Sequence, residues 1–181
     1  MGSLGGGVRA ALSKSDHRFV SEDRMQIETR SPDETEELGR RIAGILPCGS
    51  TVALRGELAA GKTCLVRGMA SHFGDVSRVH SPTFTLVNQY GDHPSLYHVD
   101  LYRLAPEDVA DLGCEEWFDS DGVCAVEWAE RAERLLPARR LDVFLEHGGH
   151  DTRKIALCNR GLLTEGWQRT LLGETLGHGF E

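Results

Sequence analysis

The chain has 181 residues, which is close to the usual size of one domain with a hydrophobic core of its own. Its 28 acidic and 20 basic side chains give a net charge of -8, which argues against a protein that grips DNA or RNA with its own surface. The sequence contains no apolar run near the roughly 18 residues that span a bilayer and no signal-peptide core. We therefore expect a cytoplasmic protein that has no membrane partner.

The cysteines and histidines do not form a pattern typical of disulfides or zinc. The 5 cysteines are odd in number and include no C-x-x-C pair, which favours reduced thiols. His147 and His150 are separated by two glycines, so they lack the helical spacing that would direct both rings to one metal ion. We expect a polar loop at these two histidines.

The first well-defined element is predicted to be a helix. Residues 1–24 are rich in glycine, serine and charge, which predicts a flexible tail. Ser31 is then suited to be an N-cap, Pro32 fits the first helical position and Glu34 completes a capping box. Apolar residues recur at helical spacing as far as Pro47, where we expect this helix to end.

A glycine-rich loop follows the next predicted strand. The β-prone run 50–54 predicts a buried strand that stops at Gly56. Beyond the loop, apolar residues return at helical spacing until Gly74, which predicts a second helix. A strand, a glycine-rich loop and a helix in this order form the setting that a phosphate-binding loop requires.

The second half of the chain alternates between predicted strands and helices. Two strands are expected to form a hairpin about the turn at 91–94, and Pro106 is expected to open a helical stretch. A further helix is predicted over 129–136, and the residues beyond Asn159 are ambiguous. The predicted strands of this half are 83–90, 96–102, 122–127, 141–145 and 154–157.

The loop from Gly56 to Thr63 matches the phosphate-loop pattern G-x-x-x-x-G-K-[ST]. Its glycines let backbone N–H groups converge on phosphate oxygens, and the helix that begins near Lys62 adds the positive end of its dipole. Lys62 would reach the β- and γ-phosphates of ATP, and the hydroxyl of Thr63 would bind Mg²⁺. The residues expected to hold the nucleotide are Glu57, Leu58, Ala59, Ala60, Gly61, Lys62, Thr63 and Cys64.

Hydrolysis also requires acidic residues, because the metal needs further oxygen ligands and a water must be placed in line with the γ-phosphate. Asp100 and Glu127 are the candidates, since each ends an apolar strand-like run. A solvated surface acid is the alternative for both. The hydroxyls of 81–85 could sense a γ-phosphate or simply turn the chain, and Trp128 could stack on a ligand or belong to the core.

Five stretches, taken in order, make the chain resemble the TsaE (YjeE) family, the small bacterial ATPase of tRNA threonylcarbamoyladenosine synthesis. The stretches are RGELAAGKT, SPTFTLVNQY, LYHVDLYRL, DGVCAVEWAER and an LLP followed by two strands, so the resemblance covers roughly residues 25–158. It implies an α/β fold, a three-layer P-loop NTPase-like arrangement with a mixed sheet. It also implies an ATPase that binds ATP and Mg²⁺, is weak alone and works with TsaB and TsaD.

This resemblance places the activity in the formation of threonylcarbamoyladenosine at position 37 of tRNAs that read ANN codons, with tRNA reached only through the complex. Carried over by position, Lys62 becomes the phosphate lysine and Asp100 an acid needed for turnover. Thr63 and Glu127 become Mg²⁺ ligands. Trp128 becomes an aromatic of the nucleotide site or of an interface.

The family pattern also concerns the edges of the site. Thr83 and Thr85 belong to a switch-like loop, and residues 29–31 and Arg153 are expected to line the adenine end. Ala59 stands where the family commonly has a glycine in L-G-A-G-K-T. If that position has a positive φ, alanine costs about 1 kcal/mol there.

We accordingly divide the chain into a flexible tail over 1–24, a P-loop ATPase domain over 25–158 and a C-terminal extension of uncertain order over 159–181. Two alternatives to the family's role remain open on the residues alone. One is a small-molecule kinase, since short P-loop proteins often phosphorylate metabolites. The other is a nucleotide-gated adaptor that binds ATP and scarcely cleaves it.

Overall fold

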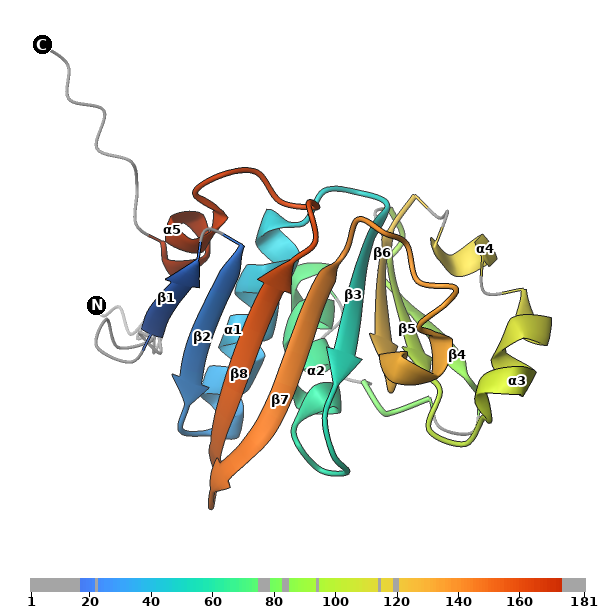
Figure 1. Cartoon of the computed structure of the whole chain (residues 1–181), viewed down its shortest axis with the longest axis horizontal. Helices are drawn as coiled ribbons and strands as arrows, with labels where there is room; N and C mark the ends of the chain where they lie inside the picture. The colour runs from blue at the N-terminus through green and yellow to red at the C-terminus, as the bar shows by residue number, and fades with distance from the viewer. Residues whose placement is uncertain are drawn as a thin grey trace, which may run out of the picture.

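The computed structural model describes residues 17–21, 23–74, 79–82, 85–93, 95–113, 115–118 and 121–173. These residues form one eight-stranded sheet in the order β1-β2-β8-β7-β3-β6-β5-β4 (Figure 1). The strands are β1 (His17–Ser21), β2 (Arg24–Thr29), β3 (Ser50–Arg55), β4 (Val87–Tyr90), β5 (Leu96–Asp100), β6 (Val123–Glu127), β7 (Leu141–Gly149) and β8 (Thr152–Asn159).

The middle of the sheet is parallel and its two sides are antiparallel. Strand β3 pairs parallel with β6 and β7, and β5 pairs parallel with β6. The β4–β5, β7–β8, β2–β8 and β1–β2 pairs are antiparallel. The predicted α/β class with a mixed sheet is therefore confirmed. The carboxyl ends of the parallel strands meet at one edge of the sheet, which is where ligands bind in open α/β sheets.

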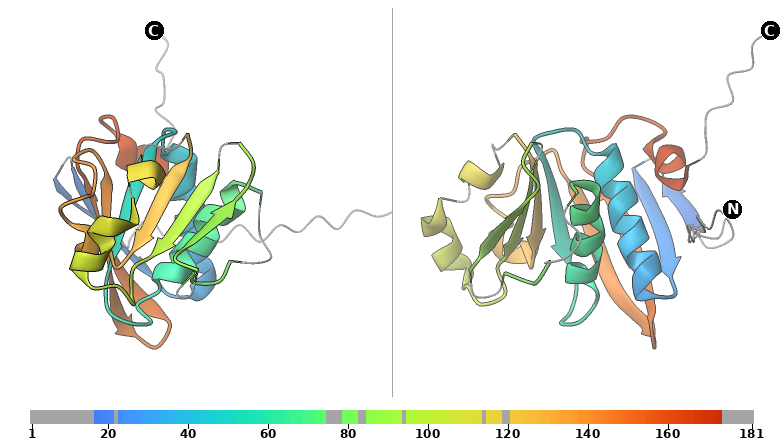
Figure 2. Two further views of the ribbon diagram at one scale, coloured as in Figure 1. Left: turned by 90° about the vertical axis from the view of Figure 1, so that its right-hand side faces the viewer. Right: turned by 180° about the vertical axis from the view of Figure 1, so that it is seen from behind.

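Two long helices cover one face of this sheet, α1 (Pro32–Ile45) and α2 (Lys62–His72), as the view from behind shows (Figure 2). They approach each other closely at two buried glycines. A Cβ atom on Gly39 would lie 2.0 Å from the Leu65 carbonyl oxygen, and one on Gly68 would lie 1.8 Å from the Glu36 carbonyl oxygen. Side chains at these two positions would therefore collide with backbone, and glycine fixes the spacing of the helix pair.

The opposite face is covered only in part. Short elements pack a second core against β3, β6 and β5, whereas that face of β2, β8 and β7 carries mostly polar side chains together with the exposed Phe144 and the half-buried Ala156. The third layer of the expected three-layer arrangement is thus confined to one half of the sheet. Its elements are α3 (Pro106–Val109), η1 (Ala110–Leu112), α4 (Glu115–Phe118) and η2 (Ala129–Ala132).

The start of α1 agrees with the prediction from its sequence. Ser31 has extended backbone dihedrals, and its hydroxyl accepts a hydrogen bond from the Glu34 N–H at 3.1 Å. The Glu34 carboxylate in turn accepts from the Arg30 N–H at 2.7 Å. Such a cap satisfies backbone donors that the first helical turn leaves unpaired, so it fixes where α1 begins beside the site.

Several predicted boundaries were wrong where pairing across the sheet decides the outcome. The helix expected over 129–136 is only the 3₁₀ turn η2. The chain turns there so that Ala129 and Ala132 are buried in the second core, and it does not continue as a helix to Pro137. The strand expected from 83 is described only from Val87. Strands β7 and β8 are longer than expected and pair up to a tight turn at His150, so His147 lies in a strand.

The two expected terminal segments also contain ordered structure. Strand β1 lies within the predicted tail and is held by antiparallel pairing with β2, which composition does not reveal. Helix α5 (Trp167–Leu172) lies in the predicted extension, and its buried Trp167 and Leu171 join the main core. The domain therefore reaches further in both directions than 25–158.

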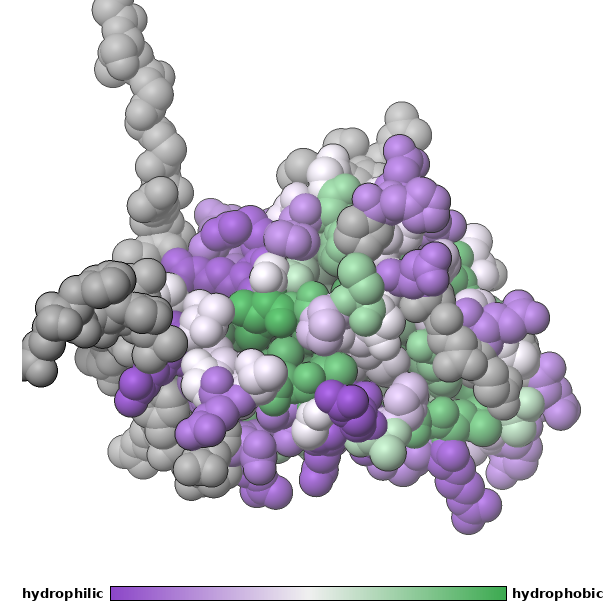
Figure 3. All heavy atoms as spheres, turned by 90° about the horizontal axis from the view of Figure 1, so that it is seen from above, coloured by the Kyte–Doolittle hydropathy of each residue, from purple (hydrophilic) through white to green (hydrophobic). Residues whose placement is uncertain are grey.

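The end of the sheet where β3 and β6 begin carries an apolar groove of about 360 Å³. The groove lies between the C-terminal end of α1 and α5. Viewed from this end, hydrophobic side chains gather at the middle of a hydrophilic surface (Figure 3). The glycine-rich loop lies at the other end of β3, so this groove is separate from the site described below.

Asp142 on β7 is a buried acid that joins distant parts of the chain. It is 1% exposed and accepts hydrogen bonds from Arg140 Nε and Arg160 Nε, both at 2.8 Å. Arg55 Nη2 on β3 lies 3.5 Å from the same carboxylate. Burial alone would raise the pKa of Asp142, but the hydrogen bonds from Arg160 and Arg140 outweigh burial and the pKa is lowered.

We expect Asp142→Asn to lower the free energy of unfolding near neutral pH by about 1.5 to 3 kcal/mol, the range for hydrogen bonds to charged groups. Because the pKa is lowered in the folded state, this stabilisation is present above about pH 4 and is lost as the pH falls through the folded-state pKa. Urea unfolding at a series of pH values would measure the difference between variant and wild type. The exposed Asp111→Asn serves as control, and a difference that stays constant into acid would contradict the prediction.

Candidate functional site

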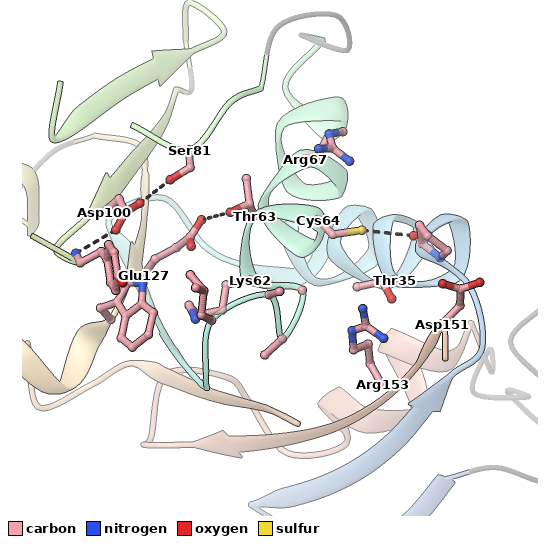
Figure 4. Close-up of a pocket in the computed structure, with 17 residues that line it drawn as sticks. Thr35, Lys62, Thr63, Cys64, Arg67, Ser81, Asp100, Glu127, Asp151 and Arg153 are labelled. Carbon is pink, nitrogen blue, oxygen red and sulfur yellow. Dashed lines mark hydrogen bonds between the residues drawn. The ribbon is translucent and has the colours of Figure 1, made fainter. Parts of the chain in front are cut away.

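A pocket of about 460 Å³ opens at the carboxyl ends of β3, β5 and β6, around the N-terminus of α2 (Figure 4). Its wall contains 58–64 of the glycine-rich loop. Asp100, Glu127 and Trp128, three further residues predicted from the sequence, also line it. The structure thus brings together in one cavity residues that are widely separated in the chain. Glu57 instead faces an adjoining groove of about 410 Å³ beside Arg55.

The backbone of the loop is held in conformations that favour glycine. The φ angles of Gly56 and Gly61 are +146° and +105°. A Cβ atom on Gly56 would lie 2.3 Å from the Leu145 carbonyl oxygen, so a side chain there would also collide with β7. Ala59 has a φ of +63°, which means that an alanine occupies a left-handed position in this loop. The positive φ that strain at Ala59 requires is thus present.

We expect Ala59→Gly to raise the free energy of unfolding of the ligand-free protein. Removing the Cβ atom relieves about 1 to 2 kcal/mol of strain in the left-handed backbone of the folded state. Glycine also makes the unfolded chain more flexible, which lowers the free energy of unfolding by about 0.4 to 1 kcal/mol, so the net effect should be a gain. Urea unfolding would measure the result. Ala60→Gly is the matched control, since Ala60 is 1% exposed without a positive φ and its loss should destabilise the fold. A decrease in stability for Ala59→Gly would mean that the alanine is unstrained.

Lys62 begins α2 and is buried, with 4% of its surface exposed. Its Nζ donates hydrogen bonds to the carbonyl oxygens of Gly56 at 2.6 Å and Glu57 at 2.8 Å. Burial lowers the pKa of the Lys62 ammonium, while the nearby carboxylates, Glu127 first, act in the opposite direction. The ammonium therefore lies inside the curled loop, at the place where a phosphate chain bound to the loop amides would meet it.

The two predicted acids lie side by side because of the parallel register. Asp100 at the end of β5 is directly opposite Glu127 at the end of β6. Both carboxylates are buried, at 2% and 3% exposure. Ser81 donates a hydrogen bond to one oxygen of Asp100, and the Tyr102 N–H donates to the other at 2.9 Å. Neither acid is thus the solvated surface residue that the sequence left as an alternative.

The oxygen atoms around Thr63 fit a magnesium ion. Thr63 Oγ1 donates a hydrogen bond to Glu127 Oε1 at 2.8 Å, so a hydroxyl and a carboxylate oxygen converge at the mouth of the loop (Figure 4). Mg²⁺ prefers a few protein oxygens and completes its shell with water and phosphate oxygens. In the part of the chain that the structure describes, no group of three or more His, Cys, Asp or Glu residues is arranged to hold a metal. The donor set therefore suits an ion that arrives with a nucleotide.

Trp128 follows Glu127 directly and has a φ of +58°, an unusual backbone conformation for a large side chain. Its ring lies over the Lys62 ammonium, with 4.0 Å between Nζ and the ring centroid. The Tyr102 ring packs against it at a centroid distance of 4.9 Å, and the Arg131 guanidinium lies 5.9 Å from it. The tryptophan is thus half-buried at the site and forms one wall of the phosphate end of the pocket.

The other end of the pocket is formed by α1, α2 and the β7–β8 turn. Arg153 lies there, with its Nε atom 3.4 Å from where a Cβ atom of Gly61 would be. Of the region expected around 29–31, the wall contains the neighbouring Pro32 and Thr35 instead. Cys64 also lines this end, and burial raises the pKa of its thiol to about 11, so it is a poor nucleophile.

The loop expected to act as a switch is described only in part. Thr83 lies outside the described residues. Thr85 is exposed, its hydroxyl donates to Asn88 Oδ1 at 3.1 Å, and it is not among the residues that line the pocket. Ser81, in contrast, reaches Asp100 and lines the pocket.

Sequence reasoning did not select His98, Tyr102, Arg67 and Asp151 as site residues. His98 has a signal in the sequence, because it lies two positions before Asp100 on a strand and so faces the same side. Tyr102 lies two positions after Asp100, and its ring contacts Trp128. Arg67 and Asp151 offered no such signal, since they approach the pocket from α2 and from the β7–β8 turn.

Within the described segments, none of the helices has the length and apolar character needed to cross a membrane. Among the described residues, Cys48, Cys64, Cys124 and Cys158 are free thiols.

Comparison with known proteins gives one consistent answer. Residues 29–155 match the family model described as "Threonylcarbamoyl adenosine biosynthesis protein TsaE". The tRNA threonylcarbamoyladenosine biosynthesis protein TsaE of Bacillus subtilis is 39% identical over 132 residues, which cover 72% of this chain and 83% of the relative. Its counterpart in Treponema pallidum is 40% identical over 134 residues, which cover 74% of this chain and 99% of the relative.

A solved structure is also similar, the "Crystal structure of Bacillus subtilus YdiB", with 34% sequence identity and a TM-score of 0.66. The alignment covers 76% of this chain and 86% of that one. The family match spans most of the described domain and includes every candidate residue of the pocket named from the sequence. The chain therefore belongs to the TsaE family of threonylcarbamoyl adenosine biosynthesis proteins.

Proposed function

We propose that this chain is the ATP-binding, Mg²⁺-dependent ATPase component of the machinery that makes threonylcarbamoyladenosine at position 37 of tRNAs reading ANN codons. The observation that carries the proposal is the contact between Thr63 Oγ1 and Glu127 Oε1 at 2.8 Å, at the mouth of the loop and beside Asp100. It joins the phosphate loop to the acids, and a phosphate loop without such acids would bind a nucleotide and not cleave it.

Each part of the pocket has its own role in this proposal. The amides of 57–64 hold the phosphates, and Lys62 leaves its loop carbonyls to pair with β- and γ-phosphate oxygens. Thr63 and Glu127 would hold Mg²⁺, which would neutralise charge on the phosphates when bound. Asp100 orients the attacking water or accepts its proton, and Trp128 closes the phosphate end of the pocket.

We further propose that the chain acts with TsaB and TsaD and meets tRNA through that complex. The net charge of -8 supports this, because a surface with an excess of acids does not attract a polyanion. A cytoplasmic location follows from this role, since the tRNA substrate is there.

Measuring ATP hydrolysis by the purified chain, with and without TsaB and TsaD, tests the proposal. Hydrolysis that is slow alone and rises when both partners are added is the expected result. Transfer of the γ-phosphate to a metabolite would support a kinase instead. Tight binding of ATP without cleavage under either condition would support a nucleotide-gated adaptor.

A further inference from the structure

His98 is a fully buried side chain next to the acids of the pocket, and it lies on β5 with 0% of its surface exposed. It is two residues before Asp100 and directly opposite Ala125 on β6. Because side chains alternate along a strand, His98 faces the same side of the sheet as both Asp100 and Glu127. It therefore lies behind the acids, on the side away from the pocket opening.

One nitrogen of this imidazole contacts Glu127. His98 Nε2 lies 2.8 Å from Glu127 Oε1, and the same oxygen accepts the hydrogen bond from Thr63 Oγ1. A carboxylate oxygen accepts hydrogen bonds, so Nε2 is the nitrogen that donates. Glu127 is thus held from two directions, by His98 from the core and by Thr63 from the mouth of the loop.

The other nitrogen shows that histidine at this position lowers the stability of the core compared with an apolar side chain. Within the described residues, His98 Nδ1 is buried and has no hydrogen-bond partner. A buried polar atom without a partner reduces stability, and an apolar side chain of similar size would fill the same space without this cost. The Tyr90 ring packs near the imidazole at a centroid distance of 6.2 Å, which any flat or apolar side chain could match. The bond to Glu127 is what distinguishes histidine here.

We propose that His98 is a positioning residue, which holds the Glu127 carboxylate in the orientation that Mg²⁺ bound with ATP requires. The inference rests on the proposed function of the site. If Thr63 served as a ligand of that ion, its hydroxyl would no longer be available to Glu127, and His98 would be the partner that keeps the carboxylate in place. Hydrogen-bond partners of metal ligands commonly change metal affinity by about 10- to 100-fold when they are removed.

The test measures ATP binding to the full chain by calorimetry over a range of Mg²⁺ concentrations, and again in EDTA without Mg²⁺. In His98→Leu, the Mg²⁺ concentration needed for half of its effect on ATP binding should rise about 10- to 100-fold. ATP binding in EDTA should stay unchanged, because the loop amides and Lys62 are intact. A general loss of structure would reduce both.

Two further variants separate the hydrogen bond from the shape of the ring. The amide of Gln reaches about as far from the backbone as Nε2, so His98→Gln should restore the wild-type Mg²⁺ dependence. The amide of Asn lies near the position of Nδ1, so His98→Asn should behave like His98→Leu. If the leucine variant does not fold, the Gln and Asn variants alone decide the question.

The possible results are distinct. Wild-type Mg²⁺ dependence in both His98→Leu and His98→Asn would overturn the inference and leave His98 as a part of the core. An equal loss of ATP binding in EDTA and in Mg²⁺ would overturn it as well. If the wild-type protein binds no ATP under either condition, the proposed function itself fails.

Discussion

Lys62→Ala is expected to abolish the stabilisation of the fold by Mg-ATP. The wild-type protein should gain about 2.7 kcal/mol when ATP is present at 100 times its dissociation constant. The variant should gain close to nothing. In the ligand-free protein the buried Lys62 ammonium contacts two loop carbonyl oxygens, and we expect it to contact phosphate oxygens instead when ATP binds. Urea unfolding with and without Mg-ATP would measure both values.

The matched control for this experiment is Lys154→Ala, which removes the same side chain from an exposed position on β8. It should keep the full stabilisation by Mg-ATP. An equal gain in Lys62→Ala and in wild type would show that the ammonium takes no part in binding, and the assignment of the phosphate site would have to be given up.

Asp100→Asn should keep ATP binding and lose the turnover that TsaB and TsaD stimulate. The amide occupies the same volume and can still accept the hydrogen bond from the Tyr102 N–H, so the pocket should remain intact. It cannot act as a base, and groups of that kind contribute about 10²- to 10⁴-fold to a rate. Phosphate release in the presence of both partners would measure the loss, and calorimetry would measure ATP binding.

For this second variant, Asp108→Asn on α3 is the control, since Asp108 is exposed and lies outside the pocket wall. It should hydrolyse ATP at the wild-type rate. Normal stimulated turnover in Asp100→Asn would refute the role given to this acid, whereas weaker ATP binding would assign Asp100 to nucleotide affinity.

Features that depend on nearby residues could be read from the sequence. The cap at Ser31 and the start of α2 after the glycine-rich loop depend on chemistry within a few positions. The strain at Ala59 could be anticipated only from the family resemblance, which implies a glycine at that position, because the pattern G-x-x-x-x-G-K-[ST] allows any residue there. All but one of the residues named for the phosphates line the pocket, with Glu57 as the exception.

Features that depend on the sheet could not be read in that way. The adjacency of Asp100 and Glu127 follows from the register of β5 and β6, which the sequence does not encode locally. Asp142 gathers Arg55 from β3 and Arg160 from the residue just after β8, so no pattern along the chain reveals the cluster. His98 was missed because a buried histidine is ordinarily part of the core, and its position two residues before Asp100 gains meaning only with the distance to Glu127.

The close packing of α1 against α2 means that the site can be damaged from a distance. Gly39 and Gly68 do not line the pocket, yet a methyl group on either would overlap backbone of the neighbouring helix and displace α2, whose first residue is Lys62. In a genetic screen for loss of function, alleles at these two glycines would therefore resemble alleles of the phosphate loop.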